Sequence, residues 1–277
     1  MNKELGKALE SMGVSVASGA GMNERGGAEG FYTIECFEKE GGALLWEDKF
    51  DNVVTILGKN LALQTILTGS SYTAGLYTGL ISNVSWTPLS TTISSGSYTT
   101  GTGAVTLTTA ASHGLGVGDT FTIASAAGTG SFAALNGTFV ATTGTTGTTL
   151  NFSIVTGLTI TISGGNVTTS SATRINDTMA SHSLWTEAGS TNAPTFAARL
   201  APAFGTASGG SISTSSAVSF TMTGAGTLQG AFIVYGTGAV ATLMSTAGTL
   251  LSAGAFTGGS QPVSSGNVVQ VSYSLSL

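Results

Sequence analysis

Residues 266–277, GNVVQVSYSLSL, decide the fold class. Apolar side chains alternate with polar ones to the last residue: Val269, Val271, Tyr273 and Leu275 fall on one side, and Gln270 and the serines on the other. A period of two is typical of a strand with one buried face. We therefore expect this segment to be tied into a β-sheet.

The same signal recurs outward along the chain. Residues 30–50, GFYTIECFEKEGGALLWEDKF, alternate on both sides of a turn signal at 39–42, which predicts a β-hairpin. Further strands are expected over the apolar or alternating runs at 74–82, 195–204, 216–223, 227–236 and 239–244.

Composition supports a β-rich protein and excludes several other classes. Gly, Ser and Thr (41, 35 and 45 residues) make up nearly half of the 277 residues, while only 8% are charged, against about 25% in ordinary soluble domains. The chain lacks the sustained heptads of a long coiled coil. It also lacks the basic face of a nucleic-acid binder, since its net charge is -5. We expect no nucleic-acid partner. No run is long and apolar enough to predict a membrane span or a signal peptide, so no membrane partner is expected.

One helix is expected. In residues 51–68, DNVVTILGKNLALQTILT, apolar side chains follow helical spacing, Asp51 or Asn52 can cap the start, and Gly69 can end it. A helix this apolar should be buried, over about 53–68.

Differences in local composition divide the chain into three parts. Residues 1–29 predict a short amphipathic helix and a flexible arm. Residues 87–172 contain one charge, Asp119, and short strands are expected there at roughly ten-residue spacing, which predicts an inserted small β-barrel or sandwich. These strands are expected at 104–109, 120–124, 137–143, 150–155 and 158–163. Residues 30–86 and 173–277 would then form a discontinuous main domain, a β-sandwich with a jelly roll as its candidate variant, which contains the buried helix.

Charge is concentrated at the beginning of the chain. Residues 1–59 hold 16 of the 21 charged side chains, and the rest hold only Asp119, Arg174, Asp177, Glu187 and Arg199. A nearly uncharged surface is poorly protected against association. We therefore expect a homo-oligomer, a trimer or a dimer, with partner contacts in the charged segment. The candidate partner-binding residues are Lys3, Leu5, Lys7, Leu9, Glu35, Glu38, Glu40, Glu47 and Asp48.

Candidate chemical sites each have a simpler interpretation. Asp177, Ser181 and His182 lie close together, but no nucleophile elbow accompanies them, so a hydrogen-bonded loop anchored by Trp185 is favoured. The run from His113 to Asp119, HGLGVGD, lacks the Lys and helix of a phosphate-binding loop and predicts a turn capped by Asp119.

The remaining candidates are also structural. The carboxylates of residues 35–51 do not follow a calcium-loop pattern, and the single Cys36 excludes a disulfide framework or a Cys-rich metal site. Trp46, Trp86 and Trp185 are more often core residues than a sugar-stacking platform. We therefore expect no catalytic, cofactor-binding or metal-binding residues, and no enzymatic activity.

Several motifs together resemble a family of tailed-bacteriophage virion proteins. The resemblance covers about residues 30–83 and 173–277 and skips the expected insertion. It rests on Trp46, Phe50, Asn52, Val54, Gly58, Tyr77, Gly79 and Leu80, on the block from Asp177 to Glu187, and on Gly254, Phe256, Gly258, Gly259, Val263, Gly266 and Val269. Within the gap, HGLGVGDTFTIASAAG and LNGTFV are similar to small β-modules of phage tail and fibre proteins.

This resemblance implies a virion structural protein. We expect a capsid decoration or cement protein that binds the major capsid protein, bridges capsomers and lies on the capsid surface after synthesis in the bacterial cytoplasm. The alternative is a tail-fibre or head-fibre adhesin that binds host glycans, with the inserted domain as the glycan-binding part. A secreted hydrolase ranks third, because no catalytic constellation stands out.

Overall fold

The computed structural model describes residues 28–68, 75–84, 89–169, 174–182 and 184–276. Of the expected N-terminal helix and arm, all but residues 28 and 29 lie outside this description. The expected boundaries of the inserted domain, near 87 and 172, also lie outside it.

The C-terminal strand lies in the middle of the first sheet. Strand β17 pairs with β1 along its whole length, and β1 pairs in turn with β2 through the expected hairpin. Opposite positions are filled by like residues: Tyr32 faces Tyr273, and Ile34 faces Val271. The sheet order is β12-β17-β1-β2, with β13 also pairing with β17. The strands are β1 (Glu29–Phe37), β2 (Leu44–Asp51), β12 (Ser211–Ser213), β13 (Val218–Thr221) and β17 (Val268–Ser276).

The second sheet has the order β11-β4-β14-β15-β3, and β16 also pairs with β14. Its central strand β14 reads TLQGAFIVY over 227–235 without polar alternation, because both of its faces are buried. The strands are β3 (Val53–Val54), β4 (Leu76–Ser82), β11 (Thr186–Glu187), β14 (Gly226–Tyr235), β15 (Thr249–Ala255) and β16 (Gln261–Val263).

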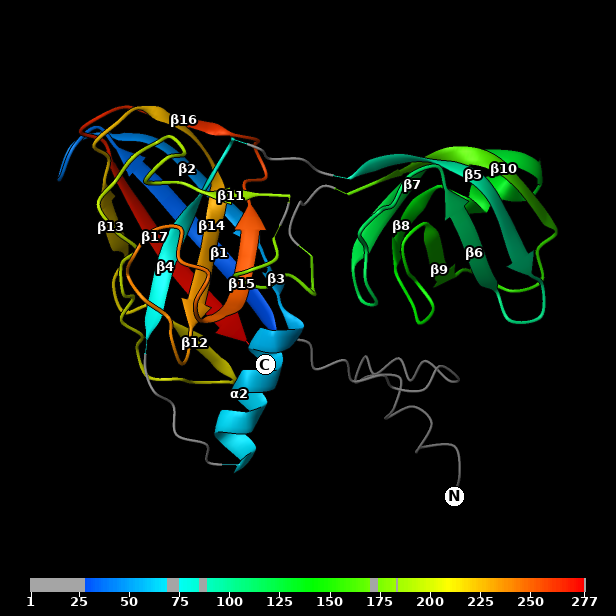
Figure 1. Cartoon of the computed structure of the whole chain (residues 1–277), viewed down its shortest axis with the longest axis horizontal. Coiled ribbons are helices and arrows are strands. Elements are labelled where there is room, and N and C mark those ends of the chain that lie inside the picture. The colour runs from blue at the N-terminus through cyan, green and yellow to red at the C-terminus, as the bar shows by residue number, and fades with distance from the viewer. Residues whose placement is uncertain (1–27, 69–74, 85–88, 170–173, 183, 277) are drawn as a thin grey trace, which may run out of the picture.

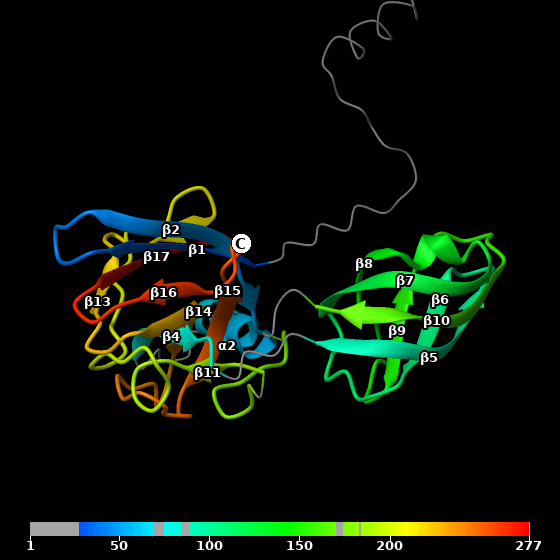
Figure 2. The same ribbon diagram turned by 90° about the horizontal axis from the view of Figure 1, so that it is seen from above.

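These two sheets pack face to face, so the predicted β-sandwich is confirmed (Figure 2). Tyr32 and Phe50 from the first sheet share one core with Leu80 and Ile233 from the second. On the outer face of the second sheet, a smaller core holds the loop residue Trp185 against Phe232 and other strand residues. The jelly-roll variant stays a prediction.

Residues 90–168 form a third sheet whose strands pair only with one another (Figure 1). The order is β8-β7-β10-β5-β6-β9. The amide of Thr142, just after β8, donates to the carbonyl of Asn151 in β9 at 2.8 Å, which brings the two edges of the sheet together. We call residues 90–168 the barrel. Val105, Leu107, Phe121 and other buried residues form a separate core. The elements are β5 (Ser90–Thr99), β6 (Ala104–Thr109), β7 (Thr120–Gly130), η1 (Phe132–Leu135), β8 (Gly137–Val140), β9 (Thr149–Ser153) and β10 (Ile160–Thr168).

Two expected strands are wrong. Residues 195–204 and 239–244 form loops, with only isolated bridges such as that between Thr78 and Leu200. The reason is a buried charge that needs partners. The Arg199 guanidinium donates to the carbonyls of Val240 and Ser245, and its amide donates to that of Ala241, so the loop curls around this side chain.

The helix is shorter and more exposed than expected. Helix α2 spans Ile56–Thr68, and Val53–Val54 belong to a strand instead. Neither Asp51 nor Asn52 caps it; the hydroxyl of Thr55 accepts from the amide of Gly58 at 3.0 Å. The prediction that it is buried is wrong: Leu57, Leu63 and Leu67 are 45%, 54% and 76% exposed. Only one side of the helix reaches the sandwich, so Leu57, Leu63 and Leu67 face outward.

Candidate functional site

The candidate acidic face lies on the β1–β2 hairpin. Glu35 and Glu47 are opposite one another in the strand register, and Glu38 and Glu40 lie exposed in the loop that joins the strands. Lys49 forms an ion pair with Glu47 at 2.5 Å, and this hydrogen bond raises the pKa of the Lys49 ammonium group. We call Glu35, Glu38, Glu40 and Glu47 the acidic face.

Asp48 does not belong to the acidic face, contrary to expectation. Its side chain points into the sandwich and is 7% exposed. Its carboxylate accepts from the amide and hydroxyl of Thr257 at 3.2 and 2.9 Å, and from the amide of Gly258 at 3.1 Å. Because β2 alternates, Asp48 and Glu47 must lie on opposite faces. The other candidates, Lys3, Leu5, Lys7 and Leu9, lie outside the described residues.

The Gly-rich turn before β7 is capped by the side-chain carboxylate of its last residue, Asp119, as predicted. Asp119 accepts from the amide of Gly116 at 2.8 Å, and the amide of Gly118 donates to Ala141 at 2.8 Å. These two amides of the turn are therefore occupied and do not face a phosphate. His113 is 2% exposed; it accepts from the amide of Leu115, and its other ring nitrogen lies 3.0 Å from the carbonyl of Thr149. Burial lowers the pKa of His113.

Asp119 also binds the described segment that follows the barrel in the chain. We call residues 174–177 the return segment. Its second carboxylate oxygen accepts from the amide of Ile175 at 2.6 Å, and the carbonyl of Ile175 accepts from the amide of Ile56 at the start of α2. One residue of the return segment is thus bonded to both domains. Burial raises the pKa of Asp119, while the two backbone hydrogen bonds oppose this rise.

Glycine is required where the return segment crosses the turn. A Cβ at Gly116 would collide with the Asn176 amide, and a Cβ at Gly118, whose φ is +95°, would lie 3.1 Å from the Ile175 side chain. The glycines of HGLGVGD therefore allow the two segments to pack closely.

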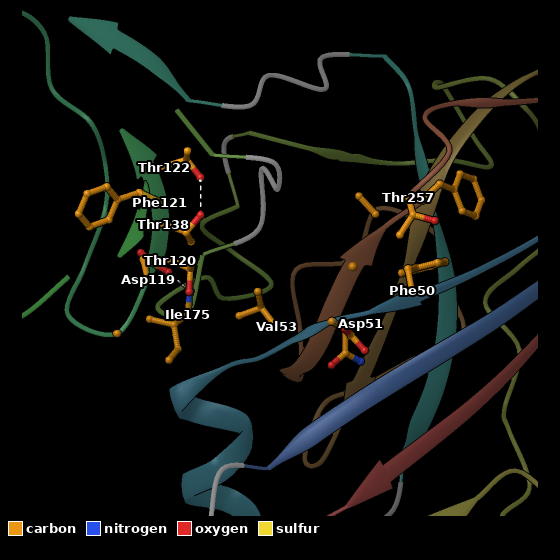
Figure 3. A pocket seen from close by; sticks show the side chains of 15 residues that line it. Phe50, Asp51, Val53, Asp119, Thr120, Phe121, Thr122, Thr138, Ile175 and Thr257 are labelled. Atoms are coloured by element: carbon orange, nitrogen blue, oxygen red, sulfur yellow. Dashed lines mark hydrogen bonds between the residues drawn. The ribbon is translucent and has the colours of Figure 1, made fainter. Parts of the chain in front are cut away.

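A cleft of about 690 Å³ lies between the two domains beside this junction (Figure 3). Residues 50–53 and 254–257 line it from the main domain, and Thr120, Thr122 and Thr138 line it from the barrel. The hydroxyls of Thr122 and Thr138 lie 3.1 Å apart and hydrogen-bond to each other. Phe50 and Phe121 are 2% and 1% exposed, so neither ring offers a face on which a sugar could stack.

The Asp177, Ser181 and His182 cluster is a loop anchor. Asp177 accepts from the amide of Arg174 at 2.9 Å and from the Trp185 indole at 3.4 Å. Ring nitrogen Nδ1 of His182 donates to the Trp185 carbonyl, and the imidazole stacks on the indole with centroids 3.9 Å apart. Within the described residues, no hydrogen bond joins His182 to Asp177 or Ser181. Burial raises the pKa of Asp177 to about 6.

The two described tryptophans, Trp46 and Trp185, do not form an exposed platform. Trp185 is 1% exposed and anchors the loop, as predicted. Trp46 donates its indole N–H to the carbonyl of Pro262 and packs edge-on against Phe256. Trp86 lies outside the described residues.

Sequence reasoning missed a buried ion pair. Arg199 binds Glu187 through two hydrogen bonds of 2.7 and 2.8 Å, with 1% and 3% of these residues exposed. Glu187 also accepts from the amide of Met244, and the guanidinium lies 5.3 Å from the Phe232 ring centre. The available signal was the rarity of charge: an isolated Glu and Arg in an apolar region are expected to need a partner.

No protein-family model, curated protein or solved structure matches this chain. Among the described residues, no group of three or more His, Cys, Asp or Glu side chains could hold a metal ion. The described part of the chain also contains no helix with the length and apolar character needed to cross a membrane.

Proposed function

We propose that this chain is a non-enzymatic structural protein of a tailed-bacteriophage virion, a capsid decoration or cement protein that binds the major capsid protein and bridges capsomers. In this proposal it acts as a homo-oligomer on the capsid surface, and many copies stabilise the head because their contacts add over the shell.

The distribution of charge on the folded molecule carries this proposal. After residue 59, all five charged side chains are engaged internally: Asp119, Arg174, Glu187 and Arg199 are buried, and half-buried Asp177 accepts two hydrogen bonds. The described surface beyond the first sheet and α2 is therefore almost uncharged. Such a surface favours the associated protein over the free monomer.

The acidic face supplies the specific contact in this proposal. Four carboxylates and the ammonium groups of Lys39 and Lys49 gather on one hairpin at the edge of the first sheet. A basic patch on the capsid would bind there with a strength that falls as salt rises. The motifs that resemble phage virion proteins support the choice of a capsid as this partner.

The test is cryo-electron microscopy of virions that carry the protein. We expect regular density on the head at positions between capsomers, and density confined to the tail would contradict the proposal. A binding assay with purified capsids tests the acidic face: replacing Glu35, Glu38, Glu40 and Glu47 by Gln should lower occupancy and flatten its salt dependence.

The matched control is the pair Lys39→Gln and Lys49→Gln, which removes the opposite charge from the same hairpin. If the capsid patch is basic, this variant binds as well as the native chain or better. Equal losses in the two variants would contradict an electrostatic contact of this sign.

The second candidate is a fibre adhesin that binds glycans through the inserted domain. The observation that favours it is that the strands within residues 90–168 pair only with one another and enclose a core of their own (Figure 1). Density on a fibre, together with glycan-dependent binding of the whole protein to host cells, would support this candidate against decoration.

A further inference from the structure

Helix α2 is apolar but only one side of it is used by the sandwich. Gly58 approaches the second sheet so closely that a Cβ there would lie 2.7 Å from the Leu251 carbonyl oxygen, and the Tyr235 hydroxyl donates to the Gly58 carbonyl at 2.7 Å. Leu61 packs against the main core. In Figure 1 the last turns of α2 extend past the ends of the neighbouring strands.

The opposite side of α2 carries a regular exposed stripe. Ile56, Asn60, Leu63 and Leu67 are all exposed, with Leu63 at 54% and Leu67 at 76%. Their spacing of four, three and four residues places them within about 60° of one another around a helix of 3.6 residues per turn. This is the spacing of alternating d and a positions in a coiled coil, where each partner helix contributes the same seam. We call these four residues the α2 seam.

We propose that the α2 seam packs in parallel against the α2 seam of a second copy of this chain, around the symmetry axis of a homo-oligomer. The proposal specifies the oligomer interface of the proposed function, but it does not depend on the capsid.

The polar residue of the seam favours a second copy as the occupant. Asn60 takes an a position, where the amides of two parallel copies can pair, the carbonyl of one accepting from the NH₂ of the other. An unrelated apolar partner would leave this amide without a hydrogen bond in a desolvated contact. In a parallel pair, the seam is therefore complementary to itself.

The charges beside the seam fit the same arrangement. Lys59 is the only charged residue of α2, and in a parallel pair its flanking position faces that of Gln64 rather than another Lys. No carboxylate lies on the helix, so a basic partner would form no ion pair with it. An acidic partner could form an ion pair only with the ammonium group of Lys59. An uncharged, Leu-rich helix of the same kind fits this face best.

Sedimentation velocity of the whole protein without capsids tests the proposal over a wide range of concentrations. We expect the native chain to associate as concentration rises and the double variant Leu63→Glu, Leu67→Glu to lose the oligomer. The matched control is Leu44→Glu, Leu45→Glu, which adds the same charge at two leucines that are 49% and 51% exposed on the hairpin. It should associate like the native chain.

A cysteine variant tests the parallel register. Asn60→Cys should form a disulfide between two copies under oxidising conditions, because parallel a positions face each other, while Thr65→Cys on the opposite side should not. The native Cys36 is fully buried and does not compete. A native chain that stays monomeric at every concentration would overturn the proposal, as would seam and control variants that associate equally.

The rival occupant is the N-terminal segment of the same chain. A chain with Leu9→Cys and Asn60→Cys that links these two cysteines within one monomer would overturn the proposal in favour of that segment. Because these experiments contain no capsid, a negative result in them would not contradict the proposal that the protein decorates the head. Likewise, a failure to bind capsids would not contradict association through the α2 seam.

Discussion

The carboxylate of Asp119 in the barrel accepts a hydrogen bond of 2.6 Å from the backbone amide of Ile175 in the return segment. Since the Ile175 carbonyl accepts in turn from the first turn of α2, this contact links the barrel to the main domain through the backbone. The two residues are 56 positions apart in the sequence. Asp119 is also one of the few charged residues beyond residue 59.

Asp119→Ala should loosen the junction. The change leaves the amides of Gly116 and Ile175 without their acceptor, which costs about 1–3 kcal/mol for each group that stays buried. We expect a lower free energy of unfolding in urea and faster proteolysis between residues 169 and 177. The control is Asp51→Ala, an exposed carboxylate beside the same cleft, which should behave like the native chain; similar losses in both would contradict the assignment.

The raised pKa of Asp177 predicts a pH dependence opposite to ordinary acid denaturation. The folded carboxyl titrates near 6 and the unfolded one near 3.8, so the folded state binds the proton more tightly. The free energy of unfolding should therefore fall as pH rises from about 4 to about 6, by on the order of 1–3 kcal/mol, and level off above.

Asp177→Asn isolates this effect, because it keeps an oxygen that can accept from Arg174 and Trp185 but does not titrate. In urea titrations across this pH range, the variant should lack the fall and be more stable than the native chain near neutral pH. A native chain and variant with parallel pH profiles would show that Asp177 is not the source.

Breaking the buried pair should be costly. Arg199→Met leaves the Glu187 carboxylate buried without its guanidinium, a change that typically costs about 3–5 kcal/mol. Adding Glu187→Gln removes the unpaired charge and should restore part of the loss, as measured by thermal or urea unfolding. Lys49→Ala, which breaks the exposed pair with Glu47, serves as the control and should leave stability unchanged.

Gly58→Ala should destabilise the protein although alanine favours helices by about 1 kcal/mol relative to glycine. The new Cβ would lie 2.7 Å from the Leu251 carbonyl oxygen and 3.0 Å from its Cα, so α2 must move away from the sheet. Gly205→Ala is the matched control, since its Cβ meets only the Ser213 carbonyl at 3.7 Å. A Gly58→Ala variant that unfolds at higher urea than the native chain would contradict this close approach.

Local patterns predicted the elements with strong alternation and missed those without it. The hairpin of β1 and β2 and the strand β17 follow the period of two that a half-buried sheet imposes. Strand β5, STTISSGSYT, was missed because its small polar residues show little contrast between faces. The run at 239–244 is apolar enough for a strand, yet it forms a loop because the carbonyls of Val240 and Ala241 accept hydrogen bonds from Arg199.

The candidate site was predictable only in part. The acidic face could be recognised because four of its charges lie within thirteen residues, whereas the inward direction of Asp48 depends on the register of β2 and on the loop at 257–258. The cap at Asp119 was predictable from its turn, but its bond to Ile175 was not.

Local sequence patterns predict the β class, the hairpin, a separate set of short strands within 87–172 and the concentration of charge near the beginning of the chain, because alternation, turn residues and composition are properties of neighbouring positions. Only the tertiary structure decided which side of α2 is free, which carboxylates face inward, and how Asp119, Ile175, Glu187 and Arg199 are partnered. Those outcomes depend on contacts between distant segments, since burial and hydrogen bonding are settled by what packs against a residue.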